Sequence, residues 1–177
     1  MKILLFTGFY LPGFKGGGPI RTIANLVERL GDQFEFWIVT ADRDLGDDQT
    51  YEQVNTNQWN KVGNAHVFYA TPSMQSFSAL IRIIRQTPHD ILYLNSFFNP
   101  KFTICPLLAR WLRLVPNKIL VIAPRGEFSS GALALKARKK IFFMMTSRLI
   151  GLYKGAIWQA STQNEAEDIR RNLGWNV

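Results

Sequence analysis

Short apolar runs alternate with stretches of helical periodicity along the whole chain. Apolar runs of this length are typical of strands that are covered on both faces of a sheet. They are Lys2–Phe6, Phe34–Thr40, His66–Ala70, Asp90–Asn95, Lys118–Ala123 and Ala156–Ala160. Helical spacing follows over Pro19–Leu30, Ser78–Gln86, Pro100–Leu114, Leu135–Tyr153 and, after a cap at Ser161 or Thr162, up to Leu173. The alternation predicts an α/β fold with a doubly wound, mostly parallel, Rossmann-like sheet and helices on both faces.

The 177 residues are enough for one α/β domain, so we expect a single domain over 1–177. No apolar run is long enough to cross a membrane. The opening MKILLFTGFYLPG is interpreted as a buried strand rather than a signal peptide, because its apolar run is short and lacks a cleavage site. The polar stretch Asp42–Lys61 is expected to be a solvated loop. Cys105 is expected to be an inert core residue, and the distant His66 and His89 form no local metal-binding motif.

Positive charge is concentrated in one part of the sequence. The formal net charge is +8, and the segment Lys101–Lys154 holds eleven Lys and Arg residues against one acid, Glu127. The remainder holds ten basic and twelve acidic residues. Such a bias concerns partners rather than fold, and it suits acidic lipid head groups, phosphorylated acceptors or nucleic acid.

Polar and glycine-rich segments follow several of the predicted strands. They are Gly8–Gly18, Asn95–Asn99, Pro124–Ser130 and Ser161–Asn164. Ligands of open parallel sheets bind outside the carboxyl ends of the strands. The four segments therefore predict a binding site at that edge of the sheet.

Three consecutive glycines, Gly16, Gly17 and Gly18, stand between the first strand and its helix. Without a Cβ atom they can let the backbone approach a ligand or adopt a positive φ, and the following helix N-terminus favours an anion. The other interpretation is a flexible or tight turn. The dinucleotide pattern GxGxxG is not in register, and the P-loop ending GK[ST] is missing because Lys15 precedes the glycines.

Arg125 and Glu127 follow the fifth strand, and Asn95 ends the fourth. An arginine can bind a carboxylate or phosphate with two parallel hydrogen bonds. Glu127 can orient Arg125 or accept from a sugar hydroxyl, and Asn95 can bind hydroxyl groups. The alternatives are a structural ion pair for Arg125 and Glu127, and a turn cap for Asn95.

A basic cluster of Lys136, Arg138, Lys139 and Lys140 begins the Leu135–Tyr153 helix. The apolar residues Phe142, Met145, Leu149 and Leu152 share one face of this helix, beside Phe143 and Met144. Such a helix can rest on an anionic membrane. The common alternative is an apolar stripe in the core and a solvated charge run.

Three segments together resemble the N-terminal domain of the family-4 retaining glycosyltransferases, which have the GT-B fold. MKILLFTGFYLPGFKGGGPIRTIANLVERL resembles the opening strand, glycine loop and first helix of that family. APRGEFSSGALALKARKK is similar to a subgroup form of the loop after the fifth strand, and STQNEAEDIRR to the Ser/Thr-x-x-Glu helix start late in the domain. The three segments occur in the family's order and span nearly the whole chain.

The resemblance implies the acceptor-binding half of a bacterial, retaining, metal-independent enzyme of polysaccharide or cell-envelope biosynthesis. It implies that a C-terminal domain, absent from this chain, grips the nucleotide-sugar donor, so that the chain alone transfers no sugar. The acceptor is then a glycan or a lipid-linked glycan, and no cofactor is needed beyond the substrates.

The resemblance also bears on single residues and on location. Gly16, Gly17 and Gly18 correspond to the family's glycine loop, near the donor phosphates or the acceptor. Many members carry a histidine after the fifth strand where this chain has Arg125, so that role cannot be transferred and the catalytic residues stay unknown. We expect a cytoplasmic domain with peripheral contact at the inner face of the cell membrane.

Two other functions are compatible with the sequence. One is a stand-alone, flavodoxin-like binding module for an anionic ligand. The other is a nucleic-acid binder, which charge alone favours, since no recognition motif or stacking surface is evident.

Overall fold

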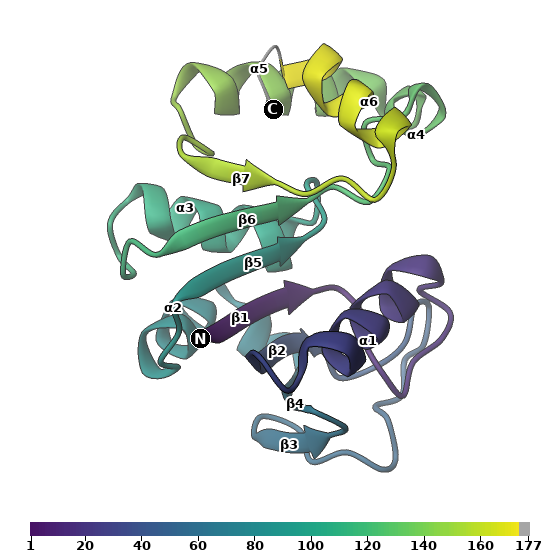
Figure 1. Cartoon of the computed structure of the whole chain (residues 1–177), viewed down its shortest axis with the longest axis vertical. Coiled ribbons are helices and arrows are strands. Elements are labelled where there is room, and N and C mark those ends of the chain that lie inside the picture. The colour runs from purple at the N-terminus through teal and green to yellow at the C-terminus, as the bar shows by residue number, and fades with distance from the viewer. Residues whose placement is uncertain (174–177) are drawn as a thin grey trace.

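The computed structural model describes residues 1–173 (Figure 1). Within this range one seven-stranded sheet has the order β3-β4-β2-β1-β5-β6-β7. Its strands are β1 (Lys2–Thr7), β2 (Glu35–Ala41), β3 (Trp59–Val62), β4 (Ala65–Ala70), β5 (Ile91–Asn95), β6 (Ile119–Ala123) and β7 (Ala156–Trp158). All neighbours pair in parallel except β3, which runs antiparallel to β4. The predicted α/β fold with a mostly parallel sheet is confirmed.

Strand β1 lies at the centre of the sheet, and its burial explains the continuous apolar runs. Leu4, Leu5 and Phe6 have no exposed surface. Leu4 and Phe6 pack into one core cluster, and Leu5 packs into the other, on the opposite face. A strand covered on both faces needs apolar side chains at successive positions rather than at alternate ones.

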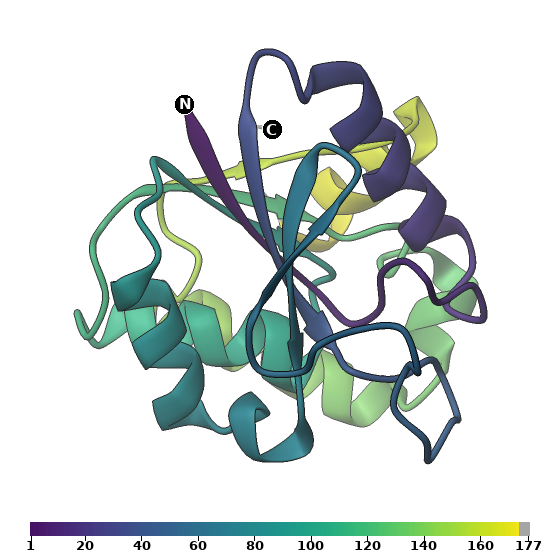
Figure 2. The same cartoon turned by 90° about the horizontal axis from the view of Figure 1, so that it is seen from below.

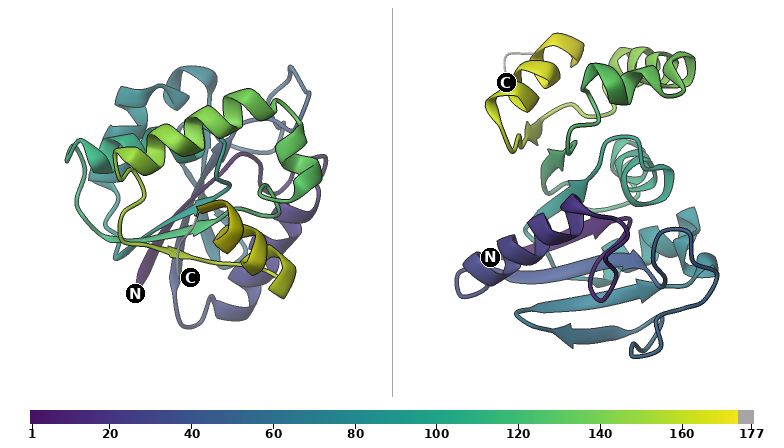
Figure 3. Two further views of the ribbon diagram at one scale, coloured as in Figure 1. Left: turned by 90° about the horizontal axis from the view of Figure 1, so that it is seen from above. Right: turned by 90° about the vertical axis from the view of Figure 1, so that its right-hand side faces the viewer.

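Helices cover both faces, as Figure 2 shows. They are α1 (Gly18–Leu30), α2 (Phe77–Gln86), α3 (Cys105–Trp111), α4 (Ser130–Ala134), α5 (Ala137–Leu149) and α6 (Gln163–Leu173), with a 3₁₀ turn η1 (Pro72–Gln75) and a π-helical turn η2 (Pro100–Ile104). Ile23 of α1 packs in the cluster with Leu5, whereas Leu80 of α2 and Leu107 of α3 pack in the cluster with Leu4. Helices α4, α5 and α6 lie at the β7 end of the sheet (Figure 3).

The expected loop Asp42–Lys61 ends in a strand that the sequence did not reveal. Trp59 of β3 pairs with Phe68 of β4, and the chain turns between them at Gly63, whose φ is +55°. The four residues WNKV are too few for a periodic pattern to be recognised. The loop prediction is therefore wrong at this end.

Two predicted helices differ from the expectation. Asn99 caps the helix that begins at Pro100, because its side-chain oxygen accepts from the backbone N–H groups of Lys101 and Phe102, but the first turn is η2 rather than α-helix. The helix expected over Leu135–Tyr153 is shorter than expected, because α5 begins at Ala137 and ends at Leu149. It is preceded by α4, which the sequence did not predict, and by Lys136, whose φ of 57° is left-handed. A left-handed residue cannot continue a right-handed helix.

Candidate functional site

The carboxyl ends of β1, β5 and β6 border a hollow of about 170 Å³, here called the edge hollow. Its polar lining consists of Thr7, Asn95, Ser96, Asn99, Arg125 and Glu127, and Gly16 contributes from the loop after β1. The predicted residues Gly16, Asn95, Arg125 and Glu127 therefore come together, although β5 and β6 are separated from β1 by many residues in sequence. Gly17 and Gly18 are exposed and do not line the edge hollow.

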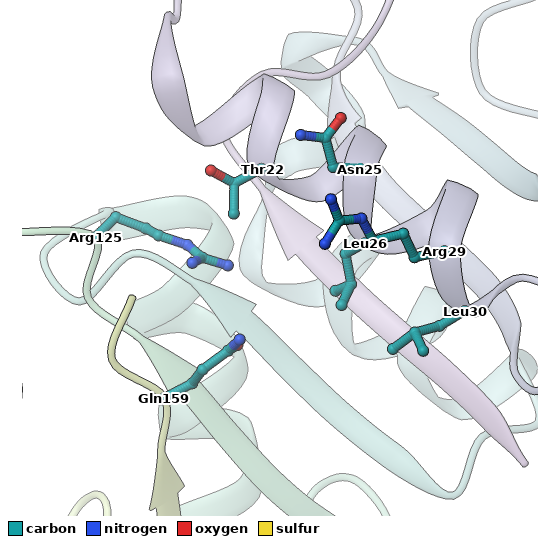
Figure 4. A pocket seen from close by; sticks show the side chains of 7 residues that line it. All are labelled: Thr22, Asn25, Leu26, Arg29, Leu30, Arg125 and Gln159. Carbon is teal, nitrogen blue, oxygen red and sulfur yellow. The ribbon is translucent and has the colours of Figure 1, made fainter. Parts of the chain in front are cut away.

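A second hollow of about 390 Å³, here called the α1 groove, lies beside helix α1 (Figure 4). It is lined by Thr22, Asn25, Leu26, Arg29, Leu30, Arg125 and Gln159. Arg125 is common to both hollows and stands where they adjoin. No carboxylate lines the α1 groove, so the two guanidinium groups that face it, Arg125 and Arg29, make it electropositive.

The Arg125 side chain is held by three neutral groups, two from strand β5 and one from the loop after β7. Its Nε donates to Asn95 Oδ1 at 2.7 Å, one Nη donates to the Tyr93 hydroxyl at 2.7 Å, and the other donates to Ser161 Oγ at 2.9 Å. The Tyr93 hydroxyl in turn donates to Gln159. Burial raises the pKa of the Tyr93 phenol, although the Arg125 charge opposes this, so the phenol stays protonated. These contacts fix the guanidinium in one orientation.

The charge of Arg125 has no counter-ion among residues 1–173, where every ion pair found joins other residues. Three of its five N–H groups are used by neutral acceptors, which leaves two for a ligand. The structural ion pair that the sequence left open, between Arg125 and Glu127, is not formed. A fixed, uncompensated guanidinium at the junction of two hollows suits an anionic group, above all a phosphate.

Glu127 builds the loop after β5 instead of orienting Arg125. Its carboxylate accepts from the Ser96 hydroxyl at 2.8 Å and from the backbone N–H groups of Phe97 at 2.6 Å and Phe98 at 2.9 Å. These bonds hold Ser96 at a φ of 144°, which a serine rarely adopts. Of the two roles that the sequence allowed for Glu127, orienting Arg125 is not observed, and Glu127 shapes one wall of the edge hollow.

Ser96 and Arg125 are both non-glycine residues with positive φ. Ser96 directly follows the last residue of β5, and Arg125 is the second residue after β6. Such conformations cost about 1–3 kcal/mol each and concentrate at functional sites. Glu165 supports the second of them, because its buried carboxylate accepts from the backbone N–H groups of Gly126 and Ser161 at 2.8 and 2.7 Å. Glu165, the acid of the Ser/Thr-x-x-Glu helix start, thus joins two loops of the site.

Asp44 is a residue of the site that the sequence analysis missed. It is buried, and its carboxylate accepts from the backbone N–H groups of Phe14, Lys15 and Leu45 at 2.7, 2.9 and 2.8 Å. Burial raises the pKa of Asp44, but these N–H groups outweigh burial and lower the pKa overall. Asp44 therefore anchors the glycine loop. Its position just after β2, at the same edge of the sheet as the other loops, is the signal that could have identified it.

The three glycines serve three different purposes. A Cβ on Gly16 would lie 3.0–3.1 Å from Ile20 and Phe9, so Gly16 permits close packing. Gly17 has φ 71° and ψ −137°, close to a region that only glycine occupies, although nothing lies within 4 Å of its would-be Cβ. Gly18 has open space around it and an ordinary φ at the start of α1. The need for glycine is therefore steric at one position, conformational at the next and weak at the third.

The basic cluster is divided by the fold. Lys136, Arg138 and Lys139 are exposed on α5 and its preceding residue. Lys140 turns inward, where Nζ donates to the Ala132 carbonyl at 2.6 Å and lies 4.9 Å from the centre of the Phe98 ring. None of the four lines the edge hollow or the α1 groove.

Within the described part of the chain, no group of three or more His, Cys, Asp or Glu side chains is arranged to hold a metal ion. No described helix is long and apolar enough to cross a membrane. Neither a family model nor a curated protein matches the sequence. The site itself is thus the basis for assigning a function.

Replacing Gly17 and Gly18 separately by alanine tests whether glycine is required at each position by its backbone conformation. We expect Gly17→Ala to lower the free energy of unfolding by about 1–2 kcal/mol, because alanine is strained at its φ. Gly18→Ala should instead raise it by up to about 1 kcal/mol, because alanine favours the helix. Urea unfolding followed by circular dichroism measures both, and equal effects would contradict the assignment.

Asp44→Ala removes the acceptor of three backbone N–H groups, so we expect the free energy of unfolding to fall by about 1–3 kcal/mol. Because the folded pKa of Asp44 is lowered, its contribution is complete above the unfolded pKa of about 3.9 and is lost as the pH falls through the folded value. The variant should therefore lose stability less steeply than wild type on acidification. Asp47→Ala is the control, because Asp47 forms only an exposed ion pair with Lys15 and should lower the free energy of unfolding much less than Asp44→Ala does.

Proposed function

We propose that this domain is the acceptor-binding half of a retaining, metal-independent glycosyltransferase. In this proposal the acceptor is a glycan or lipid-linked glycan that carries a phosphate, and a second domain grips most of the nucleotide-sugar donor. The observation that carries the proposal is the Arg125 guanidinium, fixed by Asn95, Tyr93 and Ser161 and without a counter-ion in the described residues. The resemblance of three sequence segments to that class of enzyme supports it independently.

The linings of the two hollows support a sugar beside the phosphate. The edge hollow offers hydroxyl and amide groups from Thr7, Ser96 and Asn99, and the α1 groove offers those of Thr22 and Asn25. Such groups can both donate to and accept from sugar hydroxyls. Leucines in the α1 groove give one apolar wall, which suits the C–H face of a sugar ring. A phosphate at the junction would then have a sugar on one side of it.

Arg125 is assigned the role of binding and orienting the anion, and no residue of this chain is assigned as a general base. A guanidinium stays protonated at all ordinary pH values, so it stabilises negative charge but does not accept a proton. Glu127, Glu165 and Asp44 hold the loops of the site, and all three carboxylates are already engaged by backbone N–H groups. Proton transfer in the proposed reaction therefore falls to the donor or to the second domain.

The same guanidinium also supports a second candidate function, a stand-alone binding module for an anionic ligand. The two candidates differ in what they require beside the anion. A module for a simple anion needs only Arg125 and the neighbouring N–H groups, whereas an acceptor site must also bind the sugar. Comparing a sugar phosphate with its two parts therefore separates them.

Calorimetric titration with glucose 1-phosphate, glucose and inorganic phosphate tests the proposal. We expect the sugar phosphate to saturate and to bind more tightly than either part, and Arg125→Lys to weaken it by about tenfold or more, because hydrogen bonds to charged groups contribute about 1.5–3 kcal/mol. Arg21→Lys, on α1 outside both hollows, should leave the affinity unchanged. Equal affinity for glucose 1-phosphate and phosphate would favour the anion module, and no saturable binding to any of the three would contradict both candidates.

A further inference from the structure

Helix α5 presents a row of apolar side chains to solvent. Phe142, Met145 and Leu149 follow one another at helical spacing, and their exposed fractions are 70, 67 and 87%. The opposite side of the helix packs on the core through Phe143 and Met144. The three members of the predicted stripe that lie in α5 are therefore exposed, whereas the fourth, Leu152, lies beyond the helix and is buried. In a soluble domain an outward helix face is normally polar, so three such side chains in a row indicate a binding surface.

The exposed apolar surface continues beyond this row. Leu135 and Ile141 extend it toward α4, and Ile150 extends it beyond the other end of α5. The indole N–H of Trp111 donates to the Ile150 carbonyl at 2.9 Å, which places that exposed ring beside the end of α5. Figure 3 shows α5 lying across the β7 end of the molecule, where none of the other described helices covers its outer side. We call this surface the outer face of α5. It consists of the apolar residues just named and of the exposed charged residues Lys136, Arg138, Lys139 and Arg148.

Every charged side chain among them is positive. Lys136, Arg138, Lys139 and Arg148 are exposed, and the sequence from Phe128 to Asn164 contains no aspartate or glutamate. Lysine and arginine can lay their aliphatic stems along an apolar surface while their charged ends reach outward. The outer face of α5 is thus apolar and cationic at once.

We propose that the outer face of α5 docks on a lipid bilayer that contains anionic lipids, with the helix lying in the plane of the interface. Charge complementarity favours anionic head groups, and the apolar side chains match the boundary with the acyl chains. A helix of 13 residues is about 20 Å long, and no described helix can cross the membrane, so the contact is peripheral.

A second copy of the chain is a poorer occupant of this surface. Two outer faces brought together would oppose like charges with no acid to separate them. A nucleic acid would satisfy the charges but would leave the aliphatic side chains Ile141, Met145 and Leu149 in water. A bilayer satisfies both properties. This inference is independent of the proposed function, because it concerns no sugar and no residue of the two hollows.

Vesicle flotation tests the inference with the whole 177-residue chain. We expect binding to phosphatidylglycerol/phosphatidylcholine vesicles and at least roughly tenfold weaker binding to pure phosphatidylcholine. The variant Phe142→Gln/Leu149→Gln and the variant Lys136→Gln/Arg138→Gln/Lys139→Gln should each weaken binding to the mixed vesicles by roughly tenfold or more. Salt should weaken it too, since the Debye length falls from about 10 Å at 0.1 M to about 3 Å at 1 M.

Matched variants on other surfaces serve as controls. Phe14→Gln/Leu45→Gln removes two exposed apolar side chains elsewhere, and Arg21→Gln/Lys61→Gln/Arg85→Gln removes the same number of exposed charges. Both should bind the mixed vesicles like wild type, and unchanged thermal melting of all four variants verifies their folding. Equal binding to both vesicle types, or equal losses in the controls and the α5 variants, would overturn the inference. So would a lipid-free dimer in sedimentation velocity that Phe142→Gln/Leu149→Gln abolishes.

Discussion

Three carboxylates at the binding edge of the sheet are engaged by backbone N–H groups, and Arg125 has no counter-ion among residues 1–173. Asp44 holds the glycine loop, Glu127 holds the loop after β5, and Glu165 joins the loops after β6 and β7. Each carboxylate accepts hydrogen bonds from backbone N–H groups that have no partner within a strand or helix and would otherwise need water. Arg125 is then restrained only by neutral acceptors. The same contacts that shape the loops thus determine the charge of the site.

The sequence predicted the layers of the fold well, because parallel strands covered on both faces must be apolar at successive positions. It did not predict β3, where four mixed residues pair with β4 through a hairpin. It also could not orient α5. Phe142, Met145 and Leu149 share one side of that helix, but Phe143, Met144 and Ser147 form a second stripe, and only the packing on β7 and the neighbouring loops decides which stripe is buried.

The sequence predicted the position of the site at the sheet edge better than it predicted the hydrogen-bond partners of the side chains there. Parallel topology brings Gly16, Asn95, Arg125 and Glu127 to one edge, and this could be inferred from their positions after the strands. Which acid faces which donor could not be inferred, because Glu127 lies two residues from Arg125 in sequence yet bonds to the loop after β5. Asp44 was missed for the same reason, since a polar stretch shows its composition but not which of its side chains is buried.

The chain connects the two proposed surfaces closely. Glu127 joins the loop that carries Arg125 to the loop after β5, Ser129 caps α4 through its hydroxyl, and α5 begins only a few residues later. Lys140 of α5 reaches back to the Phe98 ring, and Glu127 holds the Phe98 backbone. A bilayer that fixes α5 would therefore also fix the direction in which the edge hollow faces.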